Sequence, residues 1–153
     1  MTTSNIDQFN EITGRVFAHL YQAFPIPVDL RPSSIGIHEA NPGEYDHLNG
    51  GITGAEPQSH EEILFKHSIE WLRQTGYLTA ERYALSDHFT KGVLTAKGLE
   101  VLNVVPDSLA QQTSIGEQLA EASKSGGKEL LRSITTEALG IGVRLVLKGA
   151  GLE

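Results

Sequence analysis

Five histidines and several carboxylates gather between residues 38 and 88, and they are the side chains of this chain best suited to hold a metal ion. Imidazole nitrogens and carboxylate oxygens together bind zinc and similar metals. The group comprises His38, Glu39, Asp46, His47, His60, Glu61, Glu62, His67 and His88. Its spacing matches no established motif such as H-E-x-x-H, although His60 and His67 fall two turns apart on one predicted helix face. We therefore expect surface or packing histidines, with no metal and no other cofactor.

Other catalytic signatures are absent from the sequence. The chain has no cysteine to act as a nucleophile, no G-x-S-x-G elbow and no G-x-x-x-x-G-K-[ST] loop to hold phosphates. The glycines of residues 49–54 have a loose G-x-x-G spacing, but no strand precedes them and no capped helix follows at once. These features predict a protein that is not an enzyme.

The composition indicates one domain with an appended helical element. The 153 residues are 39% hydrophobic and 20% charged, as in ordinary globular proteins. No basic run with an apolar stretch opens the chain, and the apolar segment 139–147 contains Arg144 and is too short to span a bilayer. The lack of cysteine agrees with a reducing compartment, so we expect a cytoplasmic protein without membrane contact.

The formal net charge of −7 is concentrated in the N-terminal third. Residues 1–59 hold seven acidic side chains against two arginines, whereas residues 60–106 and residues 107–153 each hold six against five cations. An acidic chain gains little from releasing the counterions of a nucleic acid unless its few cations share one face. The charge therefore lowers the expectation of nucleic-acid binding.

A helix, a short strand and a long loop are predicted in the first 58 residues. Apolar residues recur with helical spacing from 6 to 24, Asn5 can cap the start, and two prolines follow the end. Residues 28–37 are compatible with a short edge strand interrupted by a proline. Residues 38–58 hold two prolines, four glycines and little apolar content, which predicts a long loop without regular structure.

A second helix followed by two paired strands is predicted between residues 59 and 94. Ser59 and Glu62 form a capping box, and Gly76 lies where a left-handed C-terminal cap is expected. The segments 77–83 and 89–94 have the composition of paired strands. The remaining expectations are a turn at Ser86-Asp87-His88, a bulge at Lys91-Gly92, a core position for Trp71 and a short helix capped by Thr95.

Two further helices are predicted in a C-terminal extension over residues 107–148. A weak apolar stripe ends at residues 125–127, and a stronger one follows from Leu130 to Leu145. The last helix is apolar on a second side as well, and such a helix is usually buried on two sides. Either this side forms the interface of a homodimer, or the helix packs fully against its own domain. The interface residues would be Leu139, Gly142, Val143, Val146 and Leu147.

Two segments resemble winged-helix domains. They are WLRQTGYL at residues 71–78 and VLTAKGLEVL at residues 93–102. In that superfamily a helix runs into a glycine, an aromatic residue and a leucine, a two-stranded wing follows, and L-T-x-K-G opens the closing helix. The chain is similar to small uncharacterised winged-helix proteins of bacteria and prophages over about residues 5–104. The resemblance implies an α+β, mainly helical fold that is often dimeric and often binds DNA.

The chain departs from the winged-helix pattern in two places. A winged helix normally has a second helix before its recognition helix, whereas residues 38–58 show no helical periodicity. The recognition helix, moreover, begins with His60-Glu61-Glu62, and carboxylates at its N-terminus would repel phosphates where base edges are normally contacted.

Two functional hypotheses follow, and the sequence leaves both open. The first is a dimeric winged-helix regulator that binds DNA, with Lys66, Arg73, Arg82 and Lys91 as the nucleic-acid contacts; these four residues could equally be solvated surface cations. The second is a winged-helix-like adaptor or accessory protein that binds another protein through the acidic N-terminal third and the long loop. The charge distribution favours the adaptor, and the resemblance favours the regulator.

Overall fold

The structure is α+β and mainly helical, as expected. The computed structural model describes residues 3–83, 88–106 and 113–149, and these contain five α-helices, one 3-10 helix and two small antiparallel sheets. The elements are α1 (Asn5–Ala23), β1 (Val28–Leu30), η1 (Pro32–Ile35), β2 (Glu44–Asp46), β3 (Gly51–Thr53), α2 (His60–Gln74), β4 (Leu78–Arg82), β5 (Phe89–Leu94), α3 (Ala96–Asn103), α4 (Ile115–Ser125) and α5 (Lys128–Gly149). Within the described ranges, no helix is long and apolar enough to cross a membrane.

Hydroxyl side chains begin the first four α-helices. Each accepts a hydrogen bond from a backbone N–H in the first turn of its helix, and the capping residues are Ser4, Ser59, Thr95 and Ser114. Such caps stabilise a helix by about 1 kcal/mol. The caps predicted at Ser59 and Thr95 are confirmed, whereas α1 is capped by Ser4 and not by Asn5.

Strand β5 lies between β1 and β4 in the larger sheet. Thr79 of β4 pairs with Val93 and Glu81 pairs with Thr90, so two residues of β5 face one residue of β4. The extra residue falls at Lys91-Gly92, and Lys91 has a φ of 56°, which confirms the bulge. Strand β1 is shorter than the segment considered for it, because η1 replaces its second half. Residues 86 and 87 of the expected turn lie outside the described residues.

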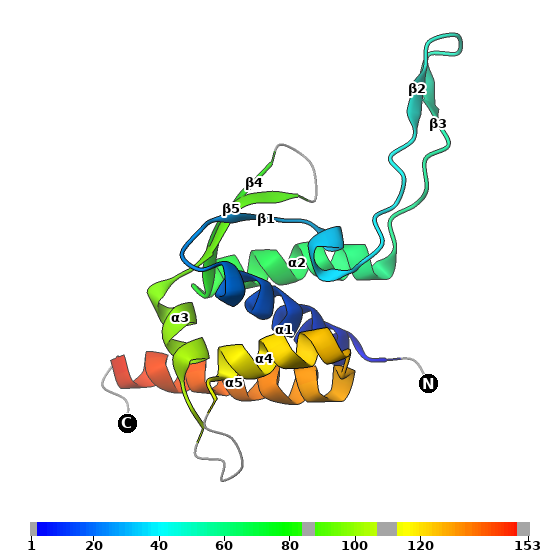
Figure 1. Ribbon diagram of the computed structural model, residues 1–153. Coiled ribbons are helices and arrows are strands. Elements are labelled where there is room, and N and C mark those ends of the chain that lie inside the picture. Colours follow the sequence, from blue (N-terminus) through cyan, green and yellow to red (C-terminus); the bar gives the residue numbers. More distant parts are fainter. Residues whose placement is uncertain (1–2, 84–87, 107–112, 150–153) are drawn as a thin grey trace.

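Helix α1 is at the centre of the core. Figure 1 shows α2 and the larger sheet on one side of α1, with α4 and α5 on the other. Its residues Val16, Phe17 and Leu20 are almost completely buried. On the α5 side, Gly14 lets the two helices approach closely, since a Cβ there would overlap the hydroxyl of Thr135. The packing of α1 therefore holds both helical layers together.

A β-hairpin occupies the segment that was expected to be an irregular loop. Strands β2 and β3 pair from Glu44 with Thr53 to Asp46 with Gly51, and Figure 1 shows the hairpin extending away from the helices. We call residues 40–58 the arm. The prediction of a loop without regular structure was wrong here, because Gly50 has a φ of 72° and supplies the tight turn that a two-stranded hairpin needs.

Two glycines of α5 allow a matched test of its packing. Gly142 lies against the ring and hydroxyl of Tyr77, whereas Gly140 has nothing within 4 Å of an added Cβ. We expect Gly142→Ala to lower the free energy of unfolding by about 1–3 kcal/mol through overpacking. Gly140→Ala should raise it by about 0.5–1 kcal/mol, because alanine favours a helix. Urea denaturation measures both, and equal effects would contradict the contact between α5 and Tyr77.

Candidate functional site

One line of exposed residues on α2, which we call its outward face, includes two large apolar side chains. Ile63 is 42% exposed and Trp71 is 43% exposed, and the exposed His67 lies between them. Trp71 contacts Phe9 edge to face at 5.3 Å and stacks on Tyr77 at 6.3 Å. The expected core position of Trp71 was therefore only half right, because one side of its ring system remains open to solvent.

The four cations predicted to contact DNA lie on two elements, α2 and the β4–β5 hairpin. Arg73 donates hydrogen bonds to Glu70 at 2.9 and 3.0 Å, and its guanidinium lies 5.8 Å from the ring centre of Phe89. Lys91 lies 3.5 Å from Glu81. The remaining two, Lys66 and Arg82, are respectively half-buried on α2 and exposed at the end of β4. Arg73 and Lys91 are thus each balanced by a neighbouring carboxylate.

The five residues predicted to form a dimer interface are divided by the structure. Gly142 is buried against Tyr77 of the same chain, and Leu139 packs against the core while half-buried. Val143, Val146 and Leu147 are 57, 53 and 42% exposed. Gly142 is therefore engaged in an internal contact, and its lack of a side chain serves that contact.

The arm is anchored to the body by carboxylates at its base. Arg31 donates hydrogen bonds to Glu39 at 2.8 and 3.0 Å, and the backbone N–H of Ser33 adds another at 3.0 Å. The hydrogen-bonded guanidinium of Arg31 lowers the pKa of Glu39 to about 2. Glu39 also lies 3.3 Å from His88 at the start of β5. Glu39, the residue just before the arm, is therefore held by Arg31 and Ser33, which follow β1, and by His88 next to β5.

Glu62 joins the two ends of the arm, because it bonds both Ser59, which follows the arm, and Ala40, which begins it. It completes the capping box of α2 with Ser59 and accepts a hydrogen bond from the N–H of Ala40 at 3.1 Å. Burial alone would raise the pKa of Glu62, but the hydrogen bonds from Ser59 and Ala40 outweigh it and hold that pKa below its ordinary value. Asn41 and Glu56 add a reciprocal pair, since the N–H of each bonds to the other at 3.0 and 2.9 Å.

The outer part of the arm exposes large apolar side chains beside acidic ones. Tyr45, Leu48 and Ile52 are 58, 94 and 65% exposed. Asp46 accepts hydrogen bonds from the N–H of Leu48 at 2.9 Å and from the side chain of Asn49 at 2.7 Å, which orders the turn. The carboxylates are Glu44, Asp46 and Glu56, and residues 40–58 contain no lysine or arginine. The arm thus presents an ordered, acidic and partly apolar surface.

Sequence reasoning missed the arm, although a signal for it was present. The pair Asn49-Gly50 is typical of hairpin turns, and it ends the four-residue connection 47–50 between β2 and β3. Because the flanking strands are only three residues each, they show too little alternation of polar and apolar residues to be recognised. For that reason the composition of this segment predicts a loop without regular structure.

The histidines considered as metal ligands contact different partners in different parts of the fold. His60 lies 2.9 Å from the side-chain oxygen of Asn5, and His88 lies beside Glu39. Among the residues that the structure describes, no three His, Asp or Glu side chains are arranged to hold a metal ion.

The low pKa of Glu39 predicts a pH-dependent anchor. Folding lowers this pKa from 4.5 to about 2, so its stabilisation is complete above pH 4.5 and is lost as the pH falls toward 2. We expect Glu39→Gln to lower the unfolding free energy near neutral pH by about 1 kcal/mol and to flatten the decline below pH 4.5. Urea denaturation across this pH range measures both effects. Glu44→Gln, at an exposed site on β2, is the control, and an unchanged acid decline in Glu39→Gln would refute the anchor.

No protein-family model matches this chain, and no curated protein or solved structure matches it either. Its function is therefore argued from its own residues and their geometry.

Proposed function

We propose that the chain is a non-enzymatic, winged-helix-like adaptor or accessory protein that acts through protein–protein contacts. The chain order α1, β1, α2, β4, β5, with β5 central in the sheet, supports the winged-helix part of this proposal. The β4–β5 hairpin corresponds to the wing, and η1 and the arm stand in place of the second helix. The bacterial or prophage setting belongs to the proposal and rests on the resemblance alone.

The ordered arm is the observation that carries the proposal. An isolated two-stranded hairpin is marginal in water, yet this one is anchored at its base and exposes Tyr45, Leu48 and Ile52. Burying one such side chain at an interface contributes about 1.5–3 kcal/mol. The acidic residues around them indicate a partner surface with an apolar centre and a basic rim.

The outward face of α2 provides a second contact region. Tryptophan is enriched among residues that dominate binding energy, and Trp71 is half-exposed while held by Phe9 and Tyr77. A side chain already ordered in the free protein loses less entropy on binding. Both regions therefore favour a protein partner over a phosphate backbone.

Site-specific photocrosslinking tests the adaptor role. We expect a photoreactive phenylalanine analogue at position 48 to form a discrete adduct with one protein in source cells, because Leu48 is the most exposed apolar residue of the arm. The same analogue at position 137, where Glu137 is exposed on α5, is the control. The adduct at position 48 should disappear in Tyr45→Ser/Ile52→Ser. Identical adducts from both positions, or none from position 48, would reject the arm as the contact.

A DNA-binding regulator is the alternative, and the winged-helix resemblance favours it. Titration with mixed-sequence duplex DNA at about 50 mM salt separates the two functions, because electrostatic binding is strong there. We expect no binding. Binding that weakens in Lys66→Gln/Arg73→Gln, with a shallower salt dependence, would establish the regulator instead.

A homodimer remains part of the proposal in a narrower form. The exposed residues Val143, Val146 and Leu147 form the part of α5 available to a second copy, while Gly142 and Leu139 are engaged within the chain.

A further inference from the structure

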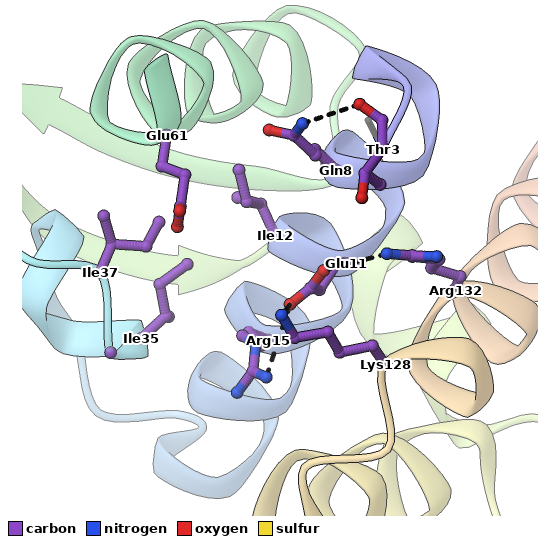
Figure 2. A pocket seen from close by; sticks show the side chains of 11 residues that line it. Thr3, Gln8, Glu11, Ile12, Arg15, Ile35, Ile37, Glu61, Lys128 and Arg132 are labelled. Carbon is purple, nitrogen blue, oxygen red and sulfur yellow. Dashed lines mark hydrogen bonds and ion pairs between the residues drawn. The ribbon is translucent and has the colours of Figure 1, made fainter. Parts of the chain in front are cut away.

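A cavity of about 370 Å³ lies where α1, η1, α2 and α5 meet. Figure 2 shows Ile35 and Ile37 on one side of it and Lys128 and Arg132 on the other, with Glu11 and Arg15 of α1 between them. This volume is within the range of small-molecule sites. The cavity is separate from the exposed face of α2 and from the outer part of the arm.

Three cations surround one carboxylate in this cavity. Glu11 lies 3.6 Å from Arg15, 3.6 Å from Arg132 and 4.0 Å from Lys128. These separations exceed the 2.7–2.9 Å of a charge-assisted hydrogen bond, so Glu11 fully engages none of the three. Although the chain is acidic overall, the cations outnumber the carboxylates at this point.

Arg132 lines the cavity with a guanidinium that is only partly paired. Its Nε is buried and makes no hydrogen bond within the described residues, and its side chain is 25% exposed. Because Nε has almost no accessible surface, a ligand in the cavity would meet the exposed part of the guanidinium. An anionic oxygen there would balance the excess positive charge.

We propose that this cavity binds a small monocarboxylate that carries an apolar chain. The carboxylate lies among Arg15, Lys128 and Arg132, and the apolar chain lies against Ile12, Ile35 and Ile37. Glu61 lines the cavity from α2 and is exposed; its charge disfavours a second carboxylate at the other end of the ligand. The ligand is therefore a monoanion, either a free acid or the C-terminal residue of a peptide.

NMR titration of the labelled full chain into the millimolar range tests this site. The probes are hexanoate, its neutral amide hexanamide, its dicarboxylate counterpart adipate, and N-acetyl-L-leucine as a peptide C-terminus. We expect hexanoate or N-acetyl-L-leucine to shift the resonances of the cavity residues, with hexanamide and adipate much weaker. The tighter of the first two identifies the source of the carboxylate. No binding by either, or equal binding of hexanamide, would overturn the site.

Matched variants assign the charges. Arg132→Gln should weaken binding about tenfold through loss of a charge-assisted hydrogen bond, whereas Arg144→Gln, at an exposed position on the same helix, should not. Glu61→Gln should tighten adipate binding and leave hexanoate unchanged. If Arg132→Gln does not fold, Lys128→Gln replaces it, because that side chain is 64% exposed. Unchanged hexanoate binding in Arg132→Gln, or in Lys128→Gln where that variant replaces it, would overturn the proposal. Weaker adipate binding in Glu61→Gln would overturn it too.

Discussion

The burial of α1 between two layers is the packing constraint on which the other elements depend. Helix α1 approaches α5 closely at Gly14, and one turn later its Phe17 lies against Tyr77, with 5.7 Å between the ring centres. Tyr77 in turn stacks on Trp71 and meets Gly142. Tyr77 therefore contacts α1, α2 and α5 at once, and the two helical layers cannot shift independently. The burial of apolar surface, at about 25 cal/mol per Å², supplies the driving force.

The arm depends on a different kind of interaction. It has no core of its own, and its position is set by the hydrogen bonds that Glu39 and Glu62 accept and by the Asn41–Glu56 pair at its base. Glu62 serves two purposes, since it caps α2 and holds the start of the arm. An element anchored in this way keeps its direction while its apolar side chains stay in water. This combination suits a surface that is completed by a partner.

Charge separates the regions of the molecule. The arm is acidic, the outward face of α2 is apolar, and cations gather with Glu11 at the junction of α1 and α5. The two cations that accompany carboxylates on α2 and β5 contribute little net positive potential. This distribution of charge is the basis for proposing a protein partner for the arm and a small anion for the cavity.

Local signals determined much of the fold. Ser59, Glu62 and Thr95 set helix starts because capping involves residues three positions apart, and the spacing of apolar residues identified the helices. Tertiary structure decided the rest. The sequence could not show that Gly142 faces Tyr77, that Trp71 stays half-exposed, or that Glu11 of α1 meets Arg132 of α5, because these contacts join residues far apart in the chain. Nor did three-residue strands reveal the arm, whose direction depends on carboxylates paired across the fold.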